Sequence, residues 1–275
     1  MKTIIGAVLS FSLIAAGAEA PTPAFKDSSL EANVRKFING AEPGKPLTQE
    51  QLNHVYLVSA SNQPIRDLAG LDSCPNLNTI YLTGSQISDL TPVSKLTNLE
   101  QLTILGGKLQ DLTPLAGLTH LKYLDLSLNQ ISDLTPLANL KDLLTLNLSG
   151  NAIAQLGPLQ GLTALQSLRL DGNQISDLKP LAGLKSLQML SVKNNRVSDL
   201  TPLINLTAWR TLYLDQNRVS DLAPLMTMVA PDRQPIKGVT PFWILSLRGN
   251  PLSAQARTRD LPELQKRAFD VIVDR

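Results

Sequence analysis

The sequence predicts an α/β solenoid, in which short strands stack into one parallel sheet. A pattern of leucines recurs every 22 residues from Leu77 to about Met226. Within one copy, Leu121 to Asp142, residues 123–127 alternate apolar and polar side chains, as a strand with one buried face does. The second half of the copy is short and broken by Pro136, which predicts a 3₁₀-like return in place of an α-helix. One copy cannot enclose its own leucines, so neighbouring copies must bury them.

Residues 1–18 have the pattern of a secretory signal peptide. Lys2 is followed by an apolar run from Ile4 to Ala16 and by small residues up to Ala18. The apolar run is too short to span a bilayer as a stable anchor. We therefore expect cleavage after Ala18 and a secreted or periplasmic protein without a membrane span.

Residues 19–76 predict an N-terminal helical cap and a first degenerate repeat. The cap's first helix is indicated by four apolar side chains that share one helical face: Leu30, Val34, Phe37 and Ile38. Asp27 or Ser28 can cap the start of this helix. Thr48 and Gln51 have the spacing of a capping box, which predicts a second short helix. Together these helices are expected to cover the bare end of the first strand.

The C-terminal part departs from the 22-residue period. Leu212 and its counterpart Leu245 are 33 residues apart, so eleven residues are inserted, and we expect an exposed loop over residues 226–241. A loop that interrupts a repeat is either functional or a tolerated excursion, and the sequence leaves both open. Its candidate contact residues are Arg233, Lys237 and Trp243. Residues 242–275 should contain the last repeat and a cap helix, with an amphipathic pattern from Pro262 to Val273.

The regular repeats, residues 77–225, read L-x-x-L-x-L-x-x-N-x-I-x-D-L-x-P-L-x-x-L, which resembles the leucine-rich repeat of bacterial internalin-like proteins. The resemblance implies a horseshoe with a parallel concave β-sheet, an irregular or 3₁₀ convex side and helical caps at both ends. It also implies a ladder of inward-pointing asparagines that bond the backbone of adjoining turns: Asn129, Asn151, Asn173, Asn195, Asn217 and Asn250. Ser85 and Gly107 stand at this position in the first two repeats, where we expect a weak ladder.

Composition and motifs argue against several classes of function. Lysine and arginine number 25 against 23 acidic residues, without a basic patch, which excludes nucleic acid as the expected partner. The two histidines, His54 and His120, belong to no catalytic or metal-binding pattern, so we expect neither an enzyme nor a cofactor. A recurrent aspartate is interrupted at Gln155, and we interpret it as a cap for free backbone N–H groups and not as a metal column. Cys74 is expected to be a small buried apolar residue.

The residues that flank the buried pair of each strand should face the concave surface in three columns. Many are small and polar, and six of the larger ones are our candidate contact residues: Tyr81, Leu105, Tyr123, Arg169, Met189 and Tyr213. Aromatic, methionine and arginine side chains are enriched at protein interfaces, although isolated exposed side chains can also have no role. In the third column four charges alternate in sign, and we expect them to satisfy one another: Asp171, Lys193, Asp215 and Arg248.

These observations favour a secreted, non-catalytic monomer that binds a protein or peptide ligand along its concave face. A second hypothesis is an envelope structural protein that self-associates. A third is an intracellular phosphatase regulator, a family whose repeat is similar in length, but residues 1–18 conflict with it. The pattern does not identify the ligand.

Overall fold

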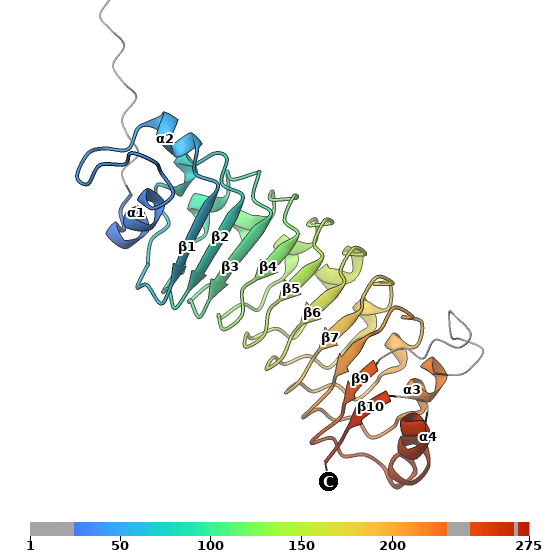
Figure 1. Cartoon of the computed structure of the whole chain (residues 1–275). Coiled ribbons are helices and arrows are strands. Elements are labelled where there is room, and N and C mark those ends of the chain that lie inside the picture. The colour runs from blue at the N-terminus through green and yellow to red at the C-terminus, as the bar shows by residue number, and fades with distance from the viewer. Residues whose placement is uncertain (1–24, 230–242, 267–268, 275) are drawn as a thin grey trace, which may run out of the picture.

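The protein is a curved array of short strands and tight turns. Its structure is a computed structural model that describes residues 25–229, 243–266 and 269–274 (Figure 1). Ten parallel strands form a single sheet in chain order, β1 to β10, which confirms the predicted solenoid. The strands are β1 (Leu57–Ser61), β2 (Thr79–Thr83), β3 (Gln101–Leu105), β4 (Tyr123–Asp125), β5 (Thr145–Asn147), β6 (Ser167–Arg169), β7 (Met189–Ser191), β8 (Thr211–Tyr213), β9 (Trp243–Ser246) and β10 (Phe269–Ile272). The predicted signal peptide, residues 1–18, lies outside the described residues.

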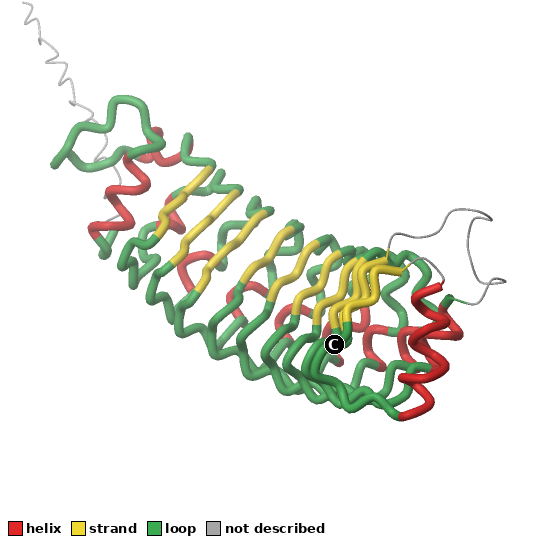
Figure 2. The backbone as a smooth tube through the Cα atoms, turned by 60° about the horizontal axis from the view of Figure 1, so that its bottom comes forward, coloured by secondary structure: helices red, strands yellow, loops and turns green. Residues whose placement is uncertain are grey.

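The strands line one side of the array, and helical turns lie on the other (Figure 2). The α-helices are α1 (Ser28–Arg35), α2 (Gln49–Asn53), α3 (Ala223–Met228) and α4 (Leu261–Lys266). The 3₁₀ turns are Leu71–Ser73, Thr91–Val93, Thr113–Leu115, Thr135–Leu137, Gly157–Gly161, Lys179–Leu181 and Thr201–Leu203. Six of these seven turns carry a proline in their first two positions, where its missing N–H is not needed.

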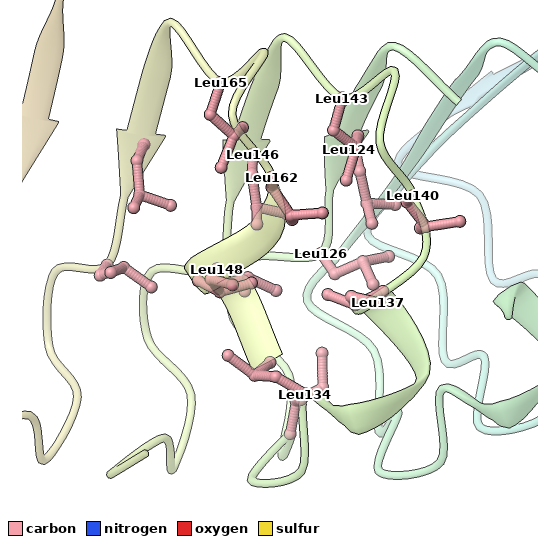
Figure 3. Close-up of a cluster of buried hydrophobic side chains, with 14 of the residues drawn as sticks. Leu124, Leu126, Leu134, Leu137, Leu140, Leu143, Leu146, Leu148, Leu162 and Leu165 are labelled. Carbon is pink, nitrogen blue, oxygen red and sulfur yellow. The ribbon is translucent and has the colours of Figure 1, made fainter. Parts of the chain in front are cut away.

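Leucines fill the space between the strands and the helical turns. In one repeat, Leu124 and Leu126 come from the strand side and Leu137 and Leu140 from the return, and all four are fully buried (Figure 3). Because the same set recurs in each repeat, the leucines of neighbouring repeats stack into one continuous core. Burying each side chain contributes roughly 1.5 to 3 kcal/mol.

Asparagines tie successive repeats together at the ends of the strands. The side-chain amide of Asn173 donates to the backbone oxygens of Leu170 and of Leu148 in the preceding repeat, both at 3.0 Å. Its Oδ1 accepts from the backbone N–H of Ile153 at 2.9 Å. The same set of bonds recurs at Asn129, Asn151, Asn195, Asn217 and Asn250.

The first two repeats lack this arrangement. The hydroxyl oxygen of Ser85 is buried and has no hydrogen-bond partner. A Cβ atom at Gly107 would lie 2.7 Å from both Asn129 Oδ1 and the backbone oxygen of Ile87, so only glycine fits beside the first asparagine of the ladder.

The recurrent aspartates act as caps of the turns. Asp133 Oδ1 accepts from the hydroxyl of Thr135 at 2.6 Å and from its backbone N–H at 2.9 Å. The hydroxyl, followed by the backbone N–H, lowers the pKa of Asp133 below its ordinary value. Five other aspartates accept the backbone N–H two residues on: Asp89, Asp111, Asp177, Asp199 and Asp221. No group of ligating side chains in the described part of the chain could hold a metal ion.

The N-terminal cap follows the predicted pattern except at one residue. Asp27 caps α1 by accepting from the backbone N–H groups of Ser29 and Leu30, and Thr48 and Gln51 form the capping box of α2. Phe37 was expected on the buried face, but 37% of it is exposed, because α1 ends at Arg35 and the following turn changes the direction of the chain. Cys74 is buried, and burial raises the pKa of its thiol to about 12.

Two predictions for the C-terminal region are corrected by the structure. Helix α3 covers Met226 to Met228, so the described start of the predicted insert loop is helical. The predicted helix from Pro262 to Val273 is wrong for residues 269–272, because these form β10 and pair in parallel with β9. The β-branched run Val271, Ile272 and Val273 favours a strand over a helix. The helical part of this region is α4 together with a π-helical segment, Ala256–Asp260.

Candidate protein-binding face

The concave face carries large side chains that stand among small ones. The six candidate contact residues that the sequence suggests are called the concave anchors from here on: Tyr81, Leu105, Tyr123, Arg169, Met189 and Tyr213. Tyr81 is 41% exposed and Tyr123 is 38% exposed, Arg169 is exposed, and the other three are half-buried. The register neighbours are Ser59 and Thr103 for Tyr81, Gln101 and Thr145 for Tyr123, Asn147 and Ser191 for Arg169, Ser167 and Thr211 for Met189, and Ser191 and Ser246 for Tyr213. Most of these register neighbours are smaller than the anchors, although the Tyr213 ring is also contacted by Lys193.

Four of the anchors come from alternate strands. Tyr81 lies on β2, Tyr123 on β4, Arg169 on β6 and Tyr213 on β8. Parallel strands are about 4.8 Å apart, so these side chains start about 10 Å from one another along the array. Burial raises the pKa of the Tyr123 hydroxyl. The neighbouring Asp125 and Tyr81 raise this pKa further, and Arg169 opposes the shift. The anchors on β2, β4 and β6 thus follow one another along the same side of the sheet.

Hydrogen bonds fix the polar floor between these anchors. Asp125, although ionisable, is buried, and its Oδ1 accepts from the backbone N–H of Ser127 at 3.0 Å and from the Ser127 hydroxyl at 2.7 Å. Its Oδ2 accepts from the side-chain amide of Asn147 at 2.9 Å, and Asn147 in turn accepts from Ser149. The floor is thus organised before any ligand arrives.

The alternating charges of the third column do not pair with one another, contrary to the prediction. No salt bridge among the described residues joins any of them: Asp171, Lys193, Asp215 and Arg248. Each aspartate instead bonds to the next repeat, because its short side chain is within reach of a serine hydroxyl and a backbone N–H. Asp171 Oδ1 accepts from Ser191 Oγ at 2.5 Å and from the backbone N–H of Lys193 at 2.8 Å. The Lys193 ammonium lies 4.2 Å from the centroid of the Tyr213 ring.

Leu128 is a surface residue that the sequence reasoning missed. It is 65% exposed and has a φ of +59°, in the left-handed region that leucine rarely adopts. All nine repeats have a positive φ at this position, but the other eight carry glycine, asparagine or glutamine: Asn62, Gly84, Gly106, Gly150, Gly172, Asn194, Gln216 and Gly249. A Cβ at Gly150 would lie 2.7 Å from Leu128 Cδ2, so the next repeat leaves room for this leucine. The signal was in the sequence, as one leucine in a column of glycine and amide residues.

Replacing Leu128 with asparagine should stabilise the protein. Asparagine tolerates the left-handed conformation and stands at this position in two other repeats, whereas leucine is strained there by roughly 1 kcal/mol. We expect the free energy of unfolding to rise by about 0.5 to 1 kcal/mol, so that the variant unfolds at a higher urea concentration. The lost leucine side chain is mostly exposed, and its removal therefore costs little packing. Leu144→Asn, at an exposed leucine that is not among the residues with positive φ, is the matched control and should give no gain. A loss of stability in the Leu128 variant would show that its packing over Gly150 outweighs the strain.

The structure describes only part of the predicted insert-loop site. Arg233 and Lys237 lie outside the described residues. The backbone of Trp243 begins β9 and pairs with Phe269 of β10. No helix in the described ranges is long and apolar enough to cross a membrane.

Comparisons with known proteins add the following. A protein-family model described as "Leucine Rich repeats (2 copies)" matches residues 119–161, 141–183 and 185–225. Internalin C2 from Listeria monocytogenes is 32% identical and aligns over 94% of this chain and 100% of its own, with a TM-score of 0.65. A leucine-rich repeat protein from Leptospira interrogans is 26% identical over 75% of this chain and 50% of its own, with a TM-score of 0.64. A search of curated proteins gave no match.

A plant structure shares the fold alone. It is the leucine-rich repeat ectodomain of the Arabidopsis thaliana membrane receptor kinase GASSHO1/SCHENGEN3, in complex with Casparian strip integrity factor 2. It is 18% identical over 82% of this chain and 28% of its own, with a TM-score of 0.59.

Proposed function

Since this chain belongs to the internalin-like leucine-rich repeat family, we propose that it is a recognition protein that binds a protein or peptide ligand along its concave face. One observation carries the proposal: large aromatic, apolar and cationic side chains stand singly among small residues on exposed strand positions. The fold accepts serine or threonine at those positions, so the fold itself does not require the larger residues. Tyrosine and arginine are among the residues that contribute most at protein interfaces.

The rigidity of the frame supports the same proposal. Stacked leucines and the asparagine ladder hold each strand in place, so an approaching ligand does not have to order the binding face. The polar floor around Asp125 is already hydrogen-bonded within the protein, so a partner can cover it without breaking those bonds. The plant ectodomain illustrates a bound factor on a related fold.

The remaining parts of the proposal concern chemistry and location. Leucine-rich repeat proteins are typically non-enzymatic binding modules, and we assign this chain no catalytic activity, no cofactor and no nucleic-acid ligand. The pattern of residues 1–18 supports export, so the partner would be met in the periplasm or outside the cell. We expect the unliganded protein to be a monomer.

Photocrosslinking from the concave face tests this function. A benzoylphenylalanine at Tyr123 should crosslink one specific protein in extracts of the source cell's envelope and surroundings, and excess unlabelled protein should compete it away. The same probe at Tyr56, which is exposed just before β1 and is not a concave anchor, is the matched control. Equal capture from both positions would contradict the concave-face assignment. Capture of only a second copy of the chain would favour the self-association hypothesis instead.

A further inference from the structure

We propose that the C-terminal end of the concave face binds an acidic peptide segment of the partner. The segment would sit in an open hollow of about 380 Å³, lined by Lys193, Tyr213, Asp215, Ser246, Arg248 and Ile272. This inference rests on the proposed function and specifies the chemistry of the ligand at one end of the same face. The hollow is built by four consecutive strands or their ends, β7 to β10.

The two cationic side chains of the hollow, Lys193 and Arg248, form no ion pair with its carboxylate, Asp215. Asp215 Oδ1 accepts from the Ser246 hydroxyl and from the backbone N–H of Arg248, the latter at 3.0 Å. The carboxylate is therefore held down on the sheet by the next repeat. Among the described residues, neither Lys193 nor Arg248 forms a salt bridge.

Two other acidic groups near the hollow, Asp171 and Asp274, are held in a similar way. Asp171, on the repeat before Lys193, bonds to Ser191 and to the Lys193 backbone. Asp274 Oδ2 accepts from the backbone N–H of Gly249 at 2.7 Å. These three carboxylates are tied to backbone groups, whereas Arg248 is exposed and Lys193 is half-buried. A ligand that approaches the face can therefore reach both cationic side chains.

The spacing of the two cations favours a peptide over a small anion. Lys193 and Arg248 occupy the same column two strands apart, and their backbones are therefore about 10 Å from each other. An extended peptide rises about 3.3 Å per residue and its side chains alternate between two faces, so acidic side chains two or four positions apart, about 7 or 13 Å, lie on the face that meets the two flexible cations. The Lys193 ammonium rests over the Tyr213 ring at 4.2 Å, which holds it at the edge of the hollow.

Fluorescence anisotropy with defined peptides tests the inference. Rhodamine-labelled hexaglutamate should bind the purified full chain, labelled hexalysine and a glycine-serine hexapeptide should not, and binding should weaken with added salt. Lys193→Met or Arg248→Met should weaken hexaglutamate binding about threefold, and the double variant about tenfold, because each removes one exposed charge contact. Lys179→Met is the matched control, since this exposed lysine lies on the 3₁₀ turn of the opposite face, and it should leave the affinity unchanged.

Three results would overturn the proposal. The first is hexaglutamate binding no better than the glycine-serine peptide, and the second is full affinity in the double variant with unchanged thermal unfolding. The third is competition by inorganic phosphate, at matched ionic strength, as strong as that by unlabelled hexaglutamate, which would indicate a small-anion site. If hexaglutamate fails while the probe at Tyr123 still captures a specific partner, this inference is wrong and the proposed function stands.

Discussion

Replacing Asn173 with alanine is expected to lower the free energy of unfolding by about 3 to 5 kcal/mol. The Asn173 amide donates to the backbone oxygens of Leu148 and Leu170, and its Oδ1 accepts from the backbone N–H of Ile153, all of them buried. Alanine would leave these groups without partners where water cannot replace the side chain. Urea denaturation followed by far-ultraviolet circular dichroism measures the change.

Asn139→Ala provides the matched control for the ladder. Asn139 is exposed on a convex-side turn, and its removal should change stability by no more than about 0.5 kcal/mol. Because the array is quasi-one-dimensional, loss of one interface can also uncouple the repeats on its two sides and broaden the transition. A change below about 1 kcal/mol in the Asn173 variant would mean that water satisfies the exposed backbone groups and that the ladder is energetically minor.

Replacing Tyr81, Tyr123 and Tyr213 together with alanine should weaken binding of the crosslinked partner at least about 100-fold. Each tyrosine that becomes buried at the centre of an interface contributes about 2 kcal/mol or more, and losses of this size multiply in the binding constant. The three side chains are exposed or half-buried in the free protein, so thermal unfolding should change little. Surface plasmon resonance with the identified partner measures the affinity.

Tyr56→Ala isolates the effect of position from that of tyrosine as a residue type. The chain contains four tyrosines, and Tyr56 is the one that is not a concave anchor, although more than half of it is exposed. Its replacement should leave the affinity within about twofold of the original, as expected for a residue outside the interface. Unchanged affinity in the triple variant, with normal unfolding, would place the binding surface elsewhere on the molecule.

The repeat period made most of the fold predictable. Because neighbouring copies must bury the same leucines, the spacing predicted the strands and the turns without any long-range information, and the resemblance to internalin-like repeats implied the ladder position of Asn173. The prediction was wrong where local patterns competed. Residues 262–273 have an amphipathic pattern, but β9 leaves an open edge that Val271 and its neighbours can join as a strand.

Side-chain partners were harder to predict than backbone positions. The alternating charges suggested ion pairs, yet Asp171 and Asp215 bond to serine hydroxyls and backbone N–H groups that a charge pattern does not reveal. Leu128 was missed because its unusual property is a positive φ, which the hydrophobic pattern does not encode. The concave anchors and the small residues beside them could be listed from the repeat, and the strand register has the same pairs as neighbours.

The asparagine ladder also makes each repeat a unit that can be removed or added as a whole. Each asparagine reaches back by one repeat, to groups that every repeat presents in the same place; Asn151 bonds to Leu126 as Asn173 bonds to Leu148. Excision of residues 143–164 would therefore bring Asn173 onto Leu126 and leave no donor or acceptor of the ladder without a partner. The length of the recognition surface, and the order of the side chains along it, can thus change in whole steps of 22 residues while the scaffold stays intact.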